Sequence, residues 1–143
     1  MSVDTYDEAA NYYYGLINNK LGNVTDAKDG FDIAAMGTEY RSAAYTALAN
    51  IYCKTNDLAR AVEYANKSIA YNRYAIDAYQ LLAVIYREQN NHSAAAKVLD
   101  TLQIYDPLNH FSRFEKFLWT PTEENKKAFT GLIRNEMPRG NIS

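Results

Sequence analysis

The chain has 143 residues, of which 48% are hydrophobic and 22% charged, and its formal net charge is −2. This length and composition suit one ordinary globular domain with a core of its own, and the Lys and Arg residues are spread along the chain with no basic stripe for nucleic acid or an anionic membrane. No apolar run approaches the roughly 20 residues that a membrane-spanning helix needs, so we expect no membrane insertion.

The ends of the sequence and its single cysteine leave the compartment open. The first residues, MSVDTYDEAANYYY, contain neither a basic segment nor an apolar one, so they predict no signal peptide. Cys53 has no second cysteine with which to form an internal disulfide. A cytoplasmic location is favoured, and a periplasmic one is the alternative if the chain is a piece of a longer protein.

Helical spacing of apolar residues continues along most of the chain, which contains only three prolines and six glycines. The pattern predicts helices over residues 6–20, 24–36, 39–54, 57–71, 75–89, 92–104, 108–119 and 121–136. Asp106 and Pro107 have the residue types of an N-cap and a first-turn proline, which would start the seventh helix. Residues 139–143 are expected to form a disordered tail.

The sequence repeats itself with a period of 34 residues. Tyr45, Leu48, Ala49 and Tyr52 return as Tyr79, Leu82, Ala83 and Tyr86, and Ala61 matches both Ala27 and Ala95. A fixed period in this range is typical of stacked helix pairs. We therefore expect one helical array over residues 1–138, with repeats at about 8–41, 42–75 and 76–109 and a degenerate fourth helix pair at 110–138.

These positions resemble the signature of the tetratricopeptide repeat (TPR) family. That family places Trp, Leu, Gly and Tyr in the first helix of each unit, then Ala, Phe and Ala in the second, and then Pro. The best matching units supply Tyr45, Leu48, Ala49, Tyr52, Ala61 and Ile69, then Tyr79, Leu82, Ala83, Tyr86, Ala95, Leu99 and Pro107. The resemblance implies an all-α fold, the α-α superhelix known as a TPR solenoid.

The C-terminal part carries a second resemblance. The stretch YDPLNHFSRFEKFLWTPTEENKKAFTGLIRNEMP is similar to a segment in the repeat region of large bacterial proteins linked to carbohydrate use. The implied alternative function is a structural or spacer segment of such a protein, in contact with a neighbouring domain. The last helices are rich in apolar residues, which predicts self-association through them: Phe114, Phe117, Leu118, Trp119, Phe129, Leu132 and Ile133.

No arrangement of residues in the sequence predicts catalysis. His92 and His110 have no acidic, Cys or His partner at a metal-ligand spacing, and nothing adjacent to Cys53 on one helix face would activate its thiol. We therefore expect a protein that is not an enzyme and that needs no cofactor or metal.

The TPR resemblance implies where a partner would bind. In that family the first helices of the units line a concave groove that holds a peptide or a protein segment. Asn50 and Gln80 could pair with a peptide backbone, Arg87 with a carboxylate, and Tyr12 and Phe114 with apolar side chains. Mapping the family's groove positions gives Ala9, Tyr12, Leu16, Asn19, Ala43, Thr46, Asn50, Cys53, Asp77, Gln80, Val84, Arg87, Phe111, Phe114 and Leu118.

The expected function is therefore a non-catalytic protein–protein interaction scaffold. The site residues that we expect to carry it are Tyr12, Thr46, Asn50, Gln80, Arg87 and Phe114. The competing interpretation of the same residues is an ordinary solvated helix face, because exposed polar faces are the rule on surface helices.

Overall fold

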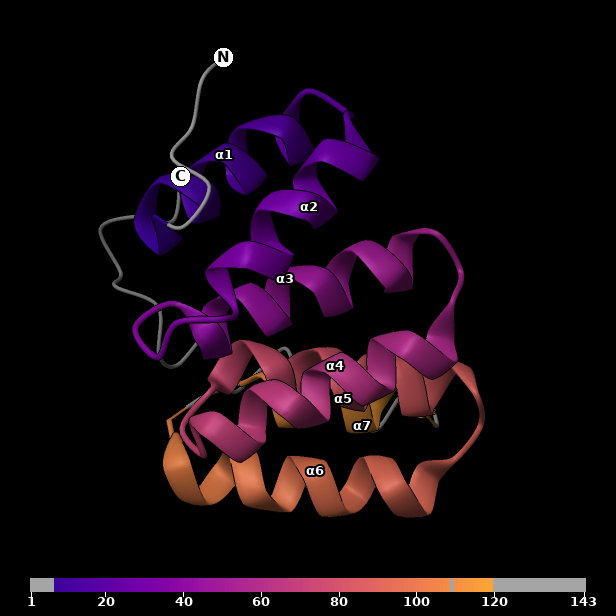
Figure 1. The fold of residues 1–143 in the computed structure, drawn as a ribbon. Helices are drawn as coiled ribbons and strands as arrows, with labels where there is room; N and C mark the ends of the chain where they lie inside the picture. The colour runs from indigo at the N-terminus through magenta and orange to yellow at the C-terminus, as the bar shows by residue number, and fades with distance from the viewer. Residues whose placement is uncertain (1–6, 109, 120–143) are drawn as a thin grey trace, which may run out of the picture.

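A computed structural model describes residues 7–108 and 110–119. Over these residues the chain is all-α and contains seven helices (Figure 1). They are α1 (Glu8–Lys20), α2 (Val24–Ala34), α3 (Arg41–Lys54), α4 (Leu58–Tyr71), α5 (Ile76–Glu88), α6 (His92–Tyr105) and α7 (Phe111–Trp119).

The first seven predicted helices are all present, with ends that differ by at most three residues. The largest difference is at the start of α7, which begins at Phe111 and not at residue 108. The backbone N–H of Asp106 donates to the Leu102 carbonyl at 2.8 Å, so Asp106 is the C-cap of α6 and its prediction as an N-cap is wrong. The predicted helix over 121–136 and the tail at 139–143 lie outside the described residues.

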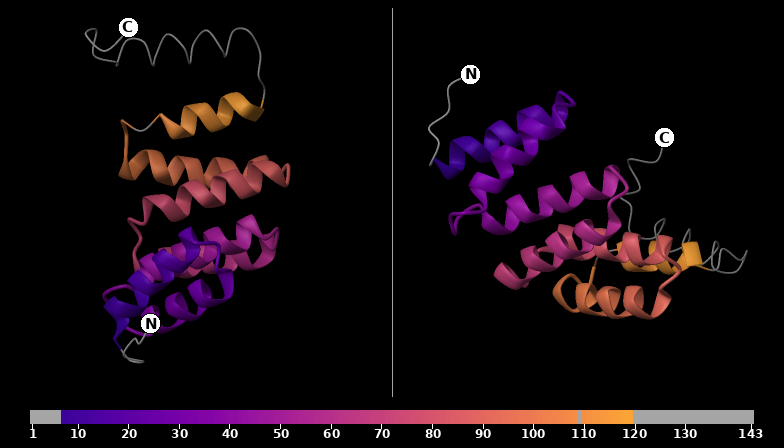
Figure 2. Two further views of the ribbon diagram at one scale, coloured as in Figure 1. Left: turned by 90° about the horizontal axis from the view of Figure 1, so that it is seen from above. Right: turned by 45° about the vertical axis from the view of Figure 1, so that its right-hand side comes forward.

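The helices pack pair by pair in chain order. The closest contacts join α1 to α2, α3 to α4, and α5 to α6, and further contacts join α2 to α3 and α4 to α5. The first helices of the second, third and fourth pairs also touch, since α5 contacts both α3 and α7 (Figure 2). No described helix is long and apolar enough to cross a membrane.

The turn inside each pair repeats with the period of the sequence. Gly22, Asn56 and Asn90 lie 34 residues apart and all have positive φ angles, of 84°, 64° and 57°. In each turn the next residue's N–H donates across it to a carbonyl five residues earlier, at 2.8 Å in all three cases. This hydrogen bond and the left-handed residue before it form a Schellman helix end, which Gly and Asn tolerate best.

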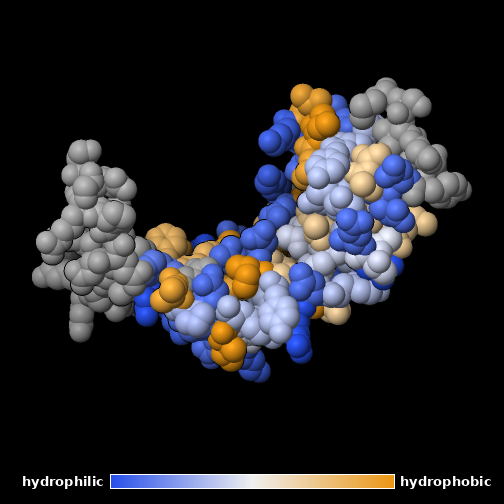
Figure 3. Space-filling view, turned by 90° about the vertical axis from the view of Figure 1, so that its left-hand side faces the viewer, coloured by the Kyte–Doolittle hydropathy of each residue, from blue (hydrophilic) through white to orange (hydrophobic). Residues whose placement is uncertain are grey.

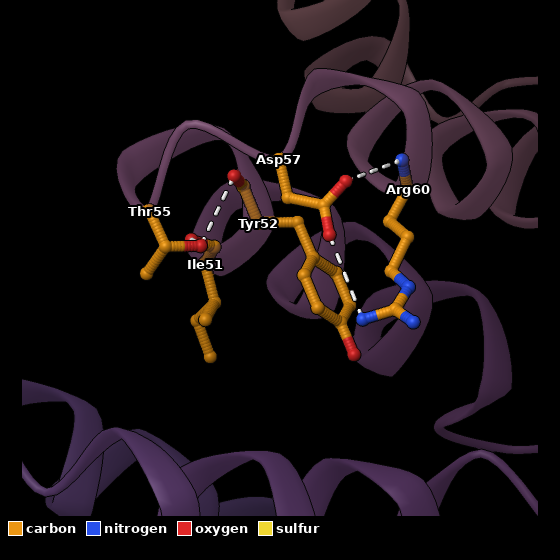
Figure 4. Close-up of polar contacts among 5 residues, drawn as sticks. All are labelled: Ile51, Tyr52, Thr55, Asp57 and Arg60. Carbon is orange, nitrogen blue, oxygen red and sulfur yellow. Dashed lines mark hydrogen bonds and ion pairs between the residues drawn. The ribbon is translucent and has the colours of Figure 1, made fainter.

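The second turn also shows how the following helix starts (Figure 4). The Thr55 hydroxyl donates to the carbonyls of Ile51 and Tyr52 at 3.1 and 3.2 Å, at the end of α3. Asp57 accepts a hydrogen bond from the backbone N–H of Arg60 at 3.3 Å and pairs with its guanidinium at 3.5 Å. The carboxylate therefore satisfies an N–H group that the first turn of α4 leaves without a helical partner.

Small residues set the distance between the two helices of each pair. Ala27, Ala61 and Ala95 occupy the same place in α2, α4 and α6, and all three are fully buried. In the first pair a larger side chain is accommodated by a glycine, because the ring of Phe31 fills the space in which a Cβ at position 15 would lie. The core therefore keeps its packing although the residues at these two positions change from one pair to the next.

Candidate binding groove

A cavity of about 710 Å³ lies between α1 and α3, and the start of α5 closes one side of it. Figure 3 shows the surface of the described residues hollowed between an upper lobe and a lower arm. The cavity is lined by Tyr12, Leu16, Asn19, Phe31, Glu39, Ser42, Ala43, Thr46, Ala47, Asn50, Lys54, Asn72, Tyr74, Ala75, Ile76 and Asp77, which we call the α1–α3 groove.

Three of the six expected site residues line this groove. They are Tyr12, Thr46 and Asn50, and four further groove positions implied by the TPR resemblance join them there: Leu16, Asn19, Ala43 and Asp77. The other three expected site residues, Gln80, Arg87 and Phe114, belong to α5 and α7 and are not among its lining residues. The structure thus brings together the N-terminal half of the expected site and not the C-terminal half.

Arg87 is held by an internal partner. Its Nε lies 2.7 Å from Oε2 of Glu115, and the Glu115 side chain is only 3% exposed. This ion pair connects α5 to α7. The guanidinium that we expected to bind a ligand carboxylate therefore already binds one from the same chain.

The hydroxyl of Thr46 on α3 forms a hydrogen bond with a residue of α4. The Thr46 Oγ1 lies 2.7 Å from the Oγ of Ser68 on α4, and the Ser42 Oγ lies 2.9 Å from the same atom. Ser68 is fully buried and its hydroxyl is within 2.9 Å of the Ser42 carbonyl. These bonds attach α3 to α4 at the wall of the groove that contains Thr46.

Asn50 and Tyr12 present a more accessible surface. Asn50 is exposed, and its Nδ2 donates to the Thr46 carbonyl at 3.3 Å. The Tyr12 ring packs on Tyr40 and Phe31, with ring centroids 5.1 and 5.7 Å apart. Burial, and then the charges of Tyr13 and Asp77, raise the pKa of the Tyr12 phenol, which is therefore a neutral donor at physiological pH.

Several residues of the groove were missed by the sequence interpretation. Phe31 belongs to a second helix, and Glu39, Asn72, Tyr74 and Ala75 precede first helices, whereas the TPR mapping covers positions within first helices only. The other missed residues are in first helices, at positions that the mapping does not include: Ser42, Ala47, Lys54 and Ile76. Lys54 is the only cation among the described lining residues, and Glu39 and Asp77 are the two carboxylates. The 34-residue period does not predict the missed residues, because the width of the gap between α1 and α3 depends on how the helices pack.

The residues that we considered for chemistry have structural surroundings. Burial, and then the charge of Glu88, raise the pKa of the half-buried Cys53 thiol, which lowers the reactive thiolate fraction. The His92 ring stacks on Trp119, with centroids 4.9 Å apart and planes 5° apart. Among the described residues no three His, Cys, Asp or Glu side chains are placed to hold one metal ion.

Fold and groove together define a class of protein, an all-α array of helix pairs with a groove between the first two pairs. No protein-family model matches the chain, and no curated protein is similar enough to it to count as a relative.

Proposed function

We propose that the chain is a non-catalytic interaction module of the TPR kind, which binds an extended peptide or protein segment in the α1–α3 groove. The observation that carries the proposal is the cavity itself, about 710 Å³ in volume and lined by seven of the residues that the resemblance assigns to a groove. A volume of this order is within the range of roughly 300–1,000 Å³ found for ligand sites in proteins.

The chemistry of the lining suits a peptide. Leu16, Ala47 and Ile76, which are partly exposed, provide apolar contact area for side chains. Asn19, Asn50 and Asn72 provide amide groups, each of which can both donate to and accept from a peptide backbone. An apolar lining with a few polar groups is the usual composition of a site that binds and orients an extended segment.

The charges of the lining indicate which peptides are preferred. The lining contains two carboxylates, Glu39 and Asp77, and one cation, Lys54, so its formal net charge is negative. Since complementary charge favours encounter and discriminates between partners, we expect segments with a Lys or Arg side chain to bind better than acidic ones.

The groove can be tested by filling it. Ala43 lines the groove and is exposed, so Ala43→Arg places a long side chain in the binding space without disturbing the core. The matched control is Ala59→Arg, which makes the same change at an exposed position of α4 that is not part of the lining. Arg is a good helix former, so both variants should fold as the wild type does.

Binding would be measured by selecting peptides from a random display library on the wild-type chain and determining their affinities by fluorescence anisotropy. We expect Ala43→Arg to weaken binding by at least about tenfold, a change of roughly 1.4 kcal/mol, and Ala59→Arg to leave it unchanged. Equal affinity for the two variants, or no peptide retained by the wild type, would refute the groove as the binding site.

A further inference from the structure

One apolar face of α1 is exposed although the same face of α3 and α5 is buried. Ile17, Ile51 and Ile85 lie 34 residues apart, and their exposed fractions are 51%, 2% and 0%. Ala44 and Ala78 are fully buried, whereas their counterpart Ala10 is only half-buried. At both sets of equivalent positions the residue type is therefore the same in all three helices, and only its exposure to solvent differs.

The structure shows what covers this face in the later pairs. On α3, Ala44, Leu48 and Ile51 pack in one cluster with residues of α2, and on α5, Ala78 and Leu82 pack with Ala65 of α4. Each first helix is thus covered by the second helix of the pair before it. α1 is at the end of the stack, and no described helix precedes it (Figures 1 and 2).

This face of α1 consists of Ile17 and Leu21, which are exposed, and Ala10 and Tyr14, which are half-buried, and we call it the end face. These positions follow one another at intervals of four, three and four residues, so they form one stripe along α1 and its C-terminal turn. Leu21 is 70% exposed, and no charged residue belongs to the stripe. The groove residues of α1, Tyr12, Leu16 and Asn19, lie on another side of the helix.

We propose that the end face binds the end face of a second copy of this chain, with the two α1 helices antiparallel. The interval pattern reads the same in both directions, so an antiparallel pair places Ala10 against Leu21 of the second copy and Tyr14 against Ile17. A small residue then meets a large one at each end, which is the complementarity that close helix packing needs.

Charge favours the same orientation. α1 has Asp7 and Glu8 at its start and Lys20 in its last turn. In an antiparallel pair the acidic start of each helix lies beside the basic end of the other, whereas a parallel pair would place like charges together. The resulting dimer closes on itself, because the same surface of each copy is used. It leaves both α1–α3 grooves open, so this contact is separate from the proposed peptide site.

Sedimentation velocity over a range of concentrations tests the contact. We expect the wild type to form dimers and Ile17→Asp to weaken dimerisation by at least about tenfold, because the variant adds a charge at the centre of the end face. The matched control is Ile104→Asp, since Ile104 is 74% exposed on α6, at a distance from the end face. A wild type that stays monomeric would overturn the proposal, and so would dimers that Ile17→Asp leaves intact, which would place self-association elsewhere, such as the C-terminal helices.

Disulfide trapping tests the orientation in a Cys53→Ser background. A mixture of the Ala10→Cys and Leu21→Cys variants should cross-link to dimers, whereas either variant alone should not. Cross-linking of each variant alone would indicate parallel helices and would overturn the antiparallel arrangement. The absence of cross-links in all three samples would overturn the contact itself.

Discussion

The guanidinium of Arg87 and the carboxylate of Glu115 form an ion pair between α5 and α7, with Nε 2.7 Å from Oε2. Glu115 is 2% exposed as a residue, and the Arg87 side chain is 27% exposed. A buried carboxylate needs a partner charge to offset the loss of its hydration. Arg87 therefore holds α7 on the array.

Removing the cation should destabilise the protein. We expect Arg87→Ala to lower the free energy of unfolding by about 3 kcal/mol, the lower end of what an uncompensated buried charge costs, because Arg87 is partly exposed. The double variant Arg87→Ala/Glu115→Ala should recover much of this loss, since it leaves no charge without a partner. Urea unfolding followed by circular dichroism measures both changes.

The matched control is the exposed ion pair of Lys116 with Asp100, at 3.8 Å and with both side chains at least half exposed. Lys116→Ala should change the unfolding free energy by less than about 0.5 kcal/mol. Equal effects of Arg87→Ala and Lys116→Ala on the unfolding free energy would mean that the buried Arg87–Glu115 pair contributes no more to stability than an exposed ion pair. Arg87 also has to be left intact in any test of peptide binding, because its loss alters α7.

Gly15 and Phe31 make a second testable relationship. A Cβ added at Gly15 would lie 2.7 Å from Cε1 of Phe31, which is fully buried. We expect Gly15→Ala to destabilise the wild type by about 1–3 kcal/mol through overpacking. In a Phe31→Ala background the same substitution should instead stabilise by up to about 1 kcal/mol, because the clash is gone and Ala favours the helix.

The second repeat explains why we expect Gly15→Ala to change from destabilising to stabilising. There the equivalent positions are Ala49 and Ala65, both fully buried, so two alanines already pack at this place. Thermal unfolding of the four variants of the cycle would measure the coupling. A destabilising effect of Gly15→Ala in both backgrounds would show that the ring of Phe31 is not what requires the glycine.

Cys53 should titrate at a higher pH in the folded chain than in the unfolded one. Burial, and then the charge of Glu88, raise the pKa of its thiol and so reduce the thiolate fraction at a given pH. We expect the pH midpoint of its alkylation by iodoacetamide to lie above that of the same chain unfolded in urea. The midpoint is the quantity to compare, since shielding of the sulfur lowers the rate at every pH. A lower midpoint in the folded chain would contradict this and would indicate an activated thiol.

Part of the groove could be predicted from the sequence. Tyr12, Thr46 and Asn50 were assigned to it from their place in the repeat, and all three line it. Gln80, Arg87 and Phe114 follow from the same mapping and do not, because the cavity forms between α1 and α3 and does not extend along α5 and α7. The burial of Glu115 could not be predicted from the sequence, since a single acidic residue on a helix usually lies on its solvated side.

The sequence by itself determined the helices and their period. Helix-forming spacing, the buried alanines at 27, 61 and 95, and the Gly or Asn at each left-handed turn act over a few residues, so the chain specifies them locally. Only the tertiary structure decided which equivalent positions differ in environment. Ile51 is buried because α2 covers this face of α3, whereas no described helix covers the same face of α1, where Ile17 is exposed. Arg87 is paired because α7 brings a carboxylate to it. Such differences arise from contacts between segments far apart in the chain, which a repeat pattern does not encode.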